Sequence, residues 1–267
     1  MPAVQLDRLK TDITDLAWQF TRPEEFRRRL HTLLDSYSNL GYRAGNNIKT
    51  AKFIQVYHVP PLVINHIELE LSHLCSENPG AALLLAEELW KDNHLETRYL
   101  AAYLLGQIPL SPPEDVLQHL ASWCKPNEEV LSLEMLLQKG SWRLRSEKPD
   151  LWLKMITGWL EHTDMHYQKM GLQSLLPLVQ DHDFENLPPI FRMVQPFVSN
   201  INTFLVPNLQ EVILTLDKRT PGETTYFLRQ MIYLHPEPEI MRLMRRLLPS
   251  LSADSQATLR VAIKEFS

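Results

Sequence analysis

The apolar residues of this chain recur with the spacing of an α-helix along almost its whole length. Between residues 82 and 90, apolar side chains fall at i, i+3, i+4, i+7 and i+8, which places them on one helical face. Similar stripes follow in Leu100, Ala101, Leu104, Leu105 and Ile108, in Leu172, Leu175, Leu176 and Val179, and in Ile240, Leu243, Met244, Leu247 and Leu248. No run alternates apolar and polar residues as a half-buried strand does. The pattern predicts an all-α protein with no sheet.

Prolines mark where the predicted helices begin. Pro79, Pro112, Pro149, Pro188 and Pro221 are separated by 33, 37, 39 and 33 residues. Proline suits the first turn of a helix, because the N–H that it lacks would have no intrahelical partner there. A start signal with a period in the thirties leaves room for two short helices per unit, as in an α-solenoid. The predicted helix pairs are 79–108, 112–138, 147–180, 183–219 and 221–249.

Each predicted pair has an apolar face that it cannot bury alone, so neighbouring pairs must stack. We therefore predict a right-handed α-solenoid of HEAT-like helix pairs, an armadillo-type superhelix. The expected organisation is a single domain over residues 1–267, with N-terminal helices in 1–52, repeats in 53–249 and a closing helix in 250–267.

The first 52 residues contain two predicted helices, 5–19 and 23–39, and then the least periodic stretch of the chain, 41–52. The tryptophans divide into two groups. Four of them occupy stripe positions and are predicted to lie in the core: Trp18, Trp90, Trp152 and Trp159. Trp123 and Trp142 fall at repeat junctions, where a solenoid presents residues to its groove.

Composition narrows the classes of function. Of the 267 residues, 44% are hydrophobic and 22% are charged, as in ordinary folded soluble proteins. No apolar run approaches the roughly 20 residues that cross a bilayer, so no membrane partner is expected. Two cysteines and no targeting pattern favour a cytoplasmic location. A net charge of −5 argues against bulk coating of nucleic acid but permits a local basic groove.

Few residues form a pattern that predicts catalysis or ligand binding. Asp181-His182-Asp183 is the densest group of metal-capable side chains, but its position at a turn favours helix capping. His66 and His73 lie seven residues apart, with no HExxH or comparable pairing. No Gly-rich loop, nucleophile motif or CxxC motif is present. We therefore expect no cofactor and no metal site.

The stretch 139–148 concentrates cations around an aromatic ring. Its candidate residues for nucleic-acid binding are Lys139, Trp142, Arg143, Arg145 and Lys148. Cations with an interleaved ring hold phosphates and stack on a base. The alternative is a solvated loop between repeats. Arg43 and Lys49, in the least periodic stretch, are further candidates for a phosphate contact.

Three motifs between residues 53 and 109 carry a family resemblance. Ile54-Gln55-Val56-Tyr57-His58-Val59-Pro60 precedes a predicted helix, Leu89-Trp90 ends the next, and Glu96-Thr97-Arg98-Tyr99-Leu100-Ala101 opens a third. They resemble the G-V-x-x-P, L-W and E-x-R-x-x-A motifs of the HEAT-repeat DNA alkylation repair family (AlkD-like DNA glycosylases), and the likeness covers roughly residues 25–265. The resemblance implies a double-stranded DNA partner. It also implies excision of cationic alkylated bases, aided by a carboxylate near the sugar.

The chain departs from that family at the positions that the resemblance assigns to chemistry. The family places a Trp and an Asp four residues apart, and here these positions hold Trp123 and Asn127. An amide lacks the negative charge that stabilises a developing oxocarbenium ion. Glu128 is the fallback acid, although residues 126–129 also have the composition of a helix start. The family's W-x-R-R pattern falls on residues 166–169 of this chain, where one cation, Lys169, is retained. Another position that is usually Trp in the family falls on Glu211.

Three functions remain open on the sequence. The resemblance and its departures favour a nucleic-acid-binding relative of the repair glycosylases that has lost glycosylase activity and is not an enzyme. One alternative is an active alkylpurine DNA glycosylase whose acid lies elsewhere. The other is a protein-interaction solenoid that holds a protein or peptide in its concave groove. A basic groove favours the first two functions, and an apolar or acidic groove favours the third.

Overall fold

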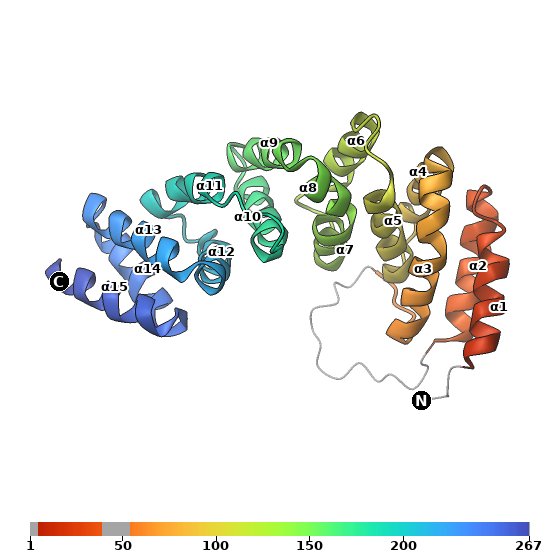
Figure 1. Ribbon diagram of the computed structural model, residues 1–267, viewed down its shortest axis with the longest axis horizontal. Helices are drawn as coiled ribbons and strands as arrows, with labels where there is room; N and C mark the ends of the chain where they lie inside the picture. The colour runs from red at the N-terminus through yellow and green to blue at the C-terminus, as the bar shows by residue number, and fades with distance from the viewer. Residues whose placement is uncertain (1–4, 39–53, 267) are drawn as a thin grey trace. The chain divides into compact units, whose positions relative to one another are not determined.

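The computed structural model of the chain describes residues 5–38 and 54–266, and Figure 1 shows them as helices joined by connections. Within these two ranges fifteen α-helices follow one another, with one π-helical turn and one 3₁₀ turn among them. The one isolated β-bridge in the described ranges joins Gln55 to His94. The prediction of an all-α chain without a sheet is confirmed for these residues. The handedness of the solenoid and its HEAT type stay predictions.

The chain forms two compact units that divide after Pro149, and the single domain expected over 1–267 stays a prediction. The helical elements of the first unit are α1 (Leu6–Ala17), α2 (Pro23–Ser36), α3 (Pro61–Glu77), α4 (Pro79–Trp90), α5 (Leu95–Gln107), α6 (Glu114–Trp123), α7 (Val130–Met135), the π-turn η1 (Leu136–Gly140) and α8 (Trp142–Glu147). Within this unit α1 packs on α3, α3 on α5 and α5 on η1, while α2 packs on α4. Stacked helices of this kind bury one another's apolar faces.

The predicted pair 79–108 is confirmed by α4 and α5. Asn78 alone separates α3 from α4, and Pro79 occupies the first turn of α4. Its stripe residues Leu85 and Leu89 are fully buried, as are Leu100 and Leu104 of α5. The two stripes therefore form the core of this pair, and α4 packs on α5 along it.

The predicted pair 112–138 is confirmed by α6 and by α7, which passes without a break into η1. Its first helix begins at Glu114, two residues after Pro112. A short helix that the sequence did not predict, α8, follows after Ser141. A Cβ atom on Gly106 of α5 would lie 1.9 Å from the carbonyl oxygen of Lys139, so η1 approaches α5 as closely as glycine alone allows. The stretch 139–148 is packed helical structure, not the solvated loop considered above.

The second unit is also helical throughout its described residues. Its elements are α9 (Pro149–Leu160), α10 (Met165–Gln180), α11 (Pro188–Ser199), α12 (Val206–Arg219), α13 (Pro221–Leu234), α14 (Pro238–Leu247), the 3₁₀ turn η2 (Leu248–Ser250) and α15 (Ala253–Glu265). Helix α10 packs on α12, α12 on α13 and α13 on α15. The pairs predicted over 147–249 and the closing helix are confirmed.

The tryptophan predictions are confirmed only in part. Trp152 and Trp159 are buried with their rings edge to face at 5.6 Å between centroids, and Trp90 is half-buried. Trp18 is 78% exposed, so its predicted core position is wrong. The buried residues of this segment are Leu9, Ile13, Leu16 and Phe20, and Trp18 has helical backbone. Two residues correspond to roughly 200° around a helix, so Trp18 faces away from Leu16 and into solvent. No helix among residues 5–38 and 54–266 is long and apolar enough to cross a membrane.

Candidate functional site

The first turn of α5 holds the segment that precedes α3 in place. Glu96, which is 8% exposed, accepts hydrogen bonds from the backbone N–H groups of Tyr57 at 3.1 Å and His58 at 2.9 Å. These bonds hold His58 in the left-handed region, with φ at 55°. The bridge between Gln55 and His94 lies beside them. The acidic residue of the E-x-R-x-x-A motif therefore fixes backbone and is not free to react.

Arg98, the arginine of the same motif, lies in a second internal network. Its Nε donates to the carbonyl oxygen of Asp92 at 2.8 Å, and its Nη1 forms an ion pair with Glu128. Its guanidinium carbon also lies 5.3 Å from the centre of the Trp90 ring. Arg98 and Glu128 have side chains that are 18% and 20% exposed, so each charge has its main partner in the other.

The position that matches the family's acid carries no ionised group. Asn127 is exposed and lies just before α7. Glu129 is the N-cap of that helix and accepts a hydrogen bond from the backbone N–H of Ser132 at 2.8 Å. The prediction that residues 126–129 start a helix is confirmed. Glu128, the fallback acid, is the residue that pairs with Arg98.

Trp123 is packed inside the first unit and is 9% exposed. Its ring stacks on Trp90 with a centroid distance of 4.9 Å and an interplanar angle of 9°. His119 lies edge-on to it at 5.4 Å and bonds through Nε2 to Glu87 at 2.7 Å. With one face covered by Trp90, the ring contributes to packing and offers little surface to a base.

The cations of the stretch 139–148 lie in different surroundings. Lys139 pairs with Glu68 at 3.2 Å and lies over the rings of Tyr99 and Tyr103. Burial alone would lower the pKa of Lys139, but Tyr99 and Glu68 raise it above its ordinary value. This lysine is therefore a paired cation between α3, α5 and η1.

The two arginines of that stretch are hydrogen-bonded to the protein. Arg143 donates from Nη1 to the carbonyl oxygen of Gln107 at 2.7 Å, and its Nε lies 3.0 Å from Glu147. Arg145 is 7% exposed and donates to Ser141 Oγ and to the carbonyl oxygen of Gln138. A buried arginine with backbone partners holds a helix end together, which is the work of a structural residue.

Two candidate residues of the stretch present open surface. Trp142, at the start of α8, is 45% exposed, and Lys148 follows the end of α8 as an exposed residue. Lys169 belongs to the second unit, where its ammonium lies 6.0 Å from the centre of the Phe204 ring. Arg43 and Lys49 lie outside the described residues. Among the candidates of the stretch 139–148, Trp142 and Lys148 are therefore the exposed ones.

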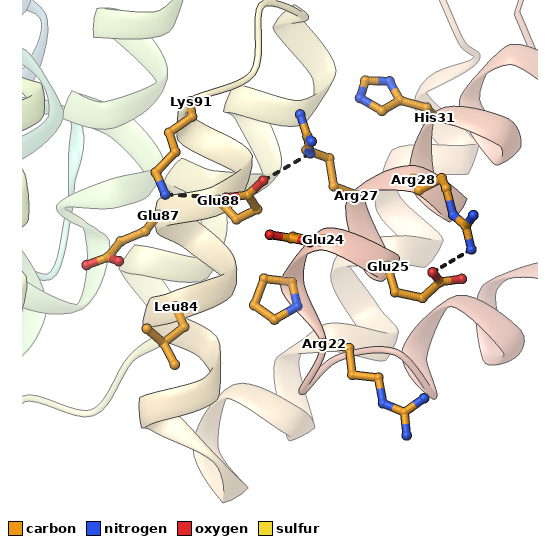
Figure 2. Close-up of a pocket in the computed structure, with 11 residues that line it drawn as sticks. Arg22, Glu24, Glu25, Arg27, Arg28, His31, Leu84, Glu87, Glu88 and Lys91 are labelled. Atoms are coloured by element: carbon orange, nitrogen blue, oxygen red, sulfur yellow. Dashed lines mark hydrogen bonds and ion pairs between the residues drawn. The ribbon is translucent and has the colours of Figure 1, made fainter.

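A large open pocket of about 950 Å³ lies between α2 and α4 (Figure 2). Its charged lining consists of His31, the basic residues Arg22, Arg27, Arg28 and Lys91, and the acidic residues Glu24, Glu25, Glu87 and Glu88. Arg27 and Lys91 both pair with Glu88, at 3.1 and 3.3 Å. Four basic side chains balance four acidic ones, so the pocket is not a strongly positive phosphate site.

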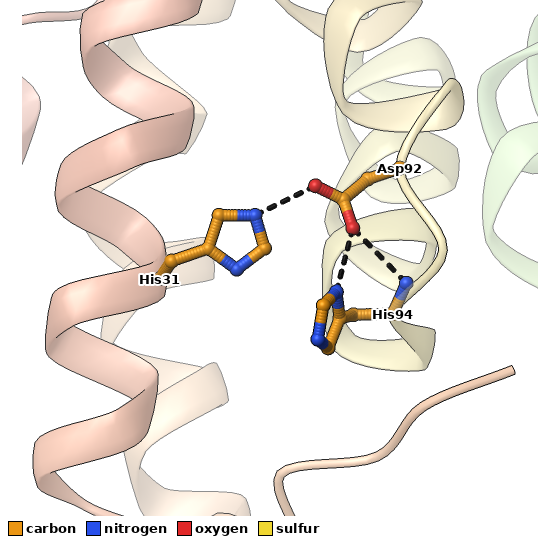
Figure 3. Close-up of side chains that lie close together, drawn as sticks. All are labelled: His31, Asp92 and His94. Carbon is orange, nitrogen blue, oxygen red and sulfur yellow. Dashed lines mark hydrogen bonds and ion pairs between the residues drawn. The ribbon is translucent and has the colours of Figure 1, made fainter.

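A cluster that the sequence did not predict lies beside this pocket. Figure 3 shows His31 of α2 facing Asp92 and His94 of the α4–α5 connection. Asp92 bonds to His31 Nε2 at 2.6 Å and to His94 Nδ1 at 2.7 Å. Burial would raise the pKa of Asp92, but these hydrogen bonds outweigh it and hold the pKa below its ordinary value. Sixty-one residues separate His31 from Asp92, so no spacing in the sequence could indicate the cluster.

Comparison with known proteins gives one finding. Residues 68–250 match the family described as DNA alkylation repair enzyme, from within α3 to the end of η2. No curated protein and no solved structure matches the chain. The matched region contains the Glu96 and Arg98 networks and the stacked pair of Trp90 and Trp123. It spans more than half of the 267 residues, and the chain therefore belongs to the DNA alkylation repair enzyme family.

Proposed function

We propose that this protein is a DNA-binding relative of the alkylation repair enzymes and has no glycosylase activity. The observation that carries the proposal is the state of the acid position. Asn127 stands there as an exposed amide, and the neighbouring Glu128 is paired with Arg98. Family membership supports DNA as the partner.

The chemistry of base excision explains why this position decides the activity. A cationic alkylpurine leaves readily, so the enzyme's main task is to stabilise positive charge that develops on the sugar. A carboxylate close to the sugar does this, because its charge is already in place before the bond breaks. Asn127 has no charge to offer. The charge of Glu128 is compensated by a guanidinium, which reduces the field that it exerts on a nearby cation.

The proposed DNA contacts are weak and few. Trp142 and Lys148 are the open residues of the stretch 139–148, where Arg143 and Lys139 have partners in the protein. The net charge of −5 opposes further phosphate contacts. Because each phosphate contact adds about 0.9 to the slope of log affinity against log salt, a contact by Lys148 contributes a slope of about −1.

Base release by the purified protein tests the catalytic part of the proposal. The substrate is duplex DNA that contains a methylated purine, and the samples are the wild type, Asn127→Asp and Glu128→Gln. We expect no release above the uncatalysed rate by the wild type or by Glu128→Gln. A gain of release in Asn127→Asp supports loss of the acid on an otherwise intact scaffold. Release by the wild type that disappears in Glu128→Gln refutes the proposal.

DNA binding is tested separately by fluorescence anisotropy with a labelled duplex over a series of salt concentrations. Lys148→Glu is expected to weaken binding and to reduce the salt slope by about 1. Trp142→Ala is expected to weaken binding through loss of ring contacts. Lys154→Glu is the matched control, since it reverses an exposed lysine on α9 of the other unit. Unchanged affinity in both test variants contradicts this surface.

A further inference from the structure

Three side chains from two segments converge on one point beside α2. His31 projects from α2, while Asp92 and His94 belong to the connection between α4 and α5. One ligand-type atom from each residue lies within 4.8 Å of the other two. Asp92 is 6% exposed, and the two histidines are half-buried. Two imidazole nitrogens and one carboxylate form a donor set that suits borderline divalent transition metals.

We propose that His31, Asp92 and His94 bind a divalent transition-metal ion of the Zn²⁺ class. Zinc binds His nitrogen and carboxylate oxygen at about 2.0 to 2.2 Å, so ligand atoms of one tetrahedral ion lie roughly 3.4 Å apart. His31 Nε2 and His94 Nδ1 already lie 2.6 and 2.7 Å from the two oxygens of Asp92. Small rotations of the two rings therefore suffice to admit an ion. Three protein ligands leave one position open to water or to an outside ligand.

The surroundings of the cluster hold its ligands in orientation. The hydroxyl of Tyr57 lies 2.8 Å from His31 Nδ1, which leaves Nε2 directed at Asp92. The Tyr57 ring stacks on His94 with 4.8 Å between centroids and 17° between planes. Glu96 fixes the Tyr57 backbone in turn. A metal-bound histidine characteristically bonds through its other ring nitrogen to such a partner, and Tyr57 supplies one for His31.

The competing arrangement is a hydrogen-bonded cluster without metal, which ties α2 to the α4–α5 connection. In it His31 Nε2–H and His94 Nδ1–H each donate a hydrogen bond to Asp92. An ion must displace these two protons and must tolerate Arg27, whose Nη1 lies 3.7 Å from Asp92. The Nε of Arg27 lies 3.1 Å from Glu88, so the guanidinium has a second carboxylate partner when an ion binds to Asp92. The site rests on this geometry alone and does not depend on DNA binding.

The test is a calorimetric titration of the chelator-treated full chain with Zn²⁺. We expect one ion per chain in the wild type. Removal of a residue that only hydrogen-bonds to a metal ligand weakens metal binding by roughly 10- to 100-fold. His31→Gln and His94→Gln each remove a ligand itself and should weaken binding by more than that. Tyr57→Phe should weaken it by about tenfold. His166→Gln is the matched control, because His166 also pairs with an aspartate, Asp164, at 2.9 Å on the surface of the second unit.

Several outcomes would overturn the site. The site is refuted if the wild type does not bind Zn²⁺, or if both His31→Gln and His94→Gln still bind it as the wild type does. It is also refuted if His166→Gln loses as much Zn²⁺ affinity as the test variants. Far-UV circular dichroism shows whether each variant is folded. If the test variants do not fold, X-ray absorption at the zinc edge of the wild-type complex decides the question. Two imidazole ligands support the site, and one or none refutes it.

Discussion

Replacing Arg98 with alanine tests whether the network of the family motif holds the first unit together. The substitution removes a bond from Nε to the Asp92 carbonyl, an ion pair with Glu128 and a cation–π contact with Trp90. It also leaves Glu128, whose side chain is 20% exposed, with an uncompensated charge. Removal of one partner from a partly buried pair costs more than the pair itself contributes.

The size of the effect follows from these contacts. A hydrogen bond to a charged group contributes about 1.5 to 3 kcal/mol, and a cation–π contact contributes about 0.5 to 1 kcal/mol. Water reaches part of Glu128, so the lower ends of the ranges apply. We expect the free energy of unfolding to fall by about 3 kcal/mol. At roughly 3 °C per kcal/mol for a unit of this size, the melting temperature falls by about 9 °C.

Thermal unfolding of the full chain, followed by circular dichroism, measures this loss. Arg242→Ala is the control: Arg242 pairs with Glu239 at 2.7 Å, but their side chains are 72% and 56% exposed. An exposed pair contributes about 0 to 1 kcal/mol, so this control should change little. The double variant Arg98→Ala/Glu128→Gln should recover part of the loss, because no charge is left unpaired. A loss in Arg98→Ala no larger than in Arg242→Ala would refute the reasoning.

Three further predictions concern other parts of the chain. Asp217 is 3% exposed and accepts hydrogen bonds from the Ser252 N–H and from the Ser255 hydroxyl. Asp217→Ala should therefore lower the free energy of unfolding by about 3 kcal/mol. Denaturant titration measures this loss, and a change near zero contradicts the prediction. Burial raises the pKa of Cys75 to about 12, so its thiol should resist iodoacetamide at mildly alkaline pH until the chain unfolds. Rapid labelling of Cys75 by iodoacetamide in the native protein contradicts this prediction. Trp18→Ser should change the free energy of unfolding by less than about 0.5 kcal/mol, since the ring is 78% exposed. A larger loss contradicts this prediction.

Local signals were sufficient to predict most of the helices. Pro79, Pro188 and Pro221 each occupy the first turn of a helix, as their fixed φ and missing N–H favour. The stripes that follow them face the core because a helix repeats every 3.6 residues. The break between α7 and α8 could not be predicted this way. It depends on the approach of η1 to Gly106, which lies about 30 residues earlier in the chain.

The stretch 139–148 shows why a cluster of cations in sequence differs from a basic patch in space. Arg143 and Arg145 have carbonyl partners on Gln107 and Gln138, and neither partner is marked by the sequence. Lys139 donates a hydrogen bond to Glu68, which lies 71 residues away in the sequence. Only folding decides whether such cations face solvent or complete internal hydrogen bonds. Here the exposed remainder is Trp142 and Lys148, which is why substitution of those two tests DNA binding more cleanly than reversal of the arginines.

The motif residues that carry the family resemblance are engaged inside the protein. Glu96 fixes the backbone of residues 57 and 58, and Arg98 joins the α4–α5 connection to Glu128 ahead of α7. A match built on such residues indicates that the scaffold is shared, because their contacts hold helices and connections in place. The resemblance assigns the catalytic acid instead to the position of Asn127, an exposed residue that no packing constraint restricts to one residue type. Loss of an acid at that position would leave the contacts of Glu96 and Arg98 intact, so a shared scaffold does not require a shared activity.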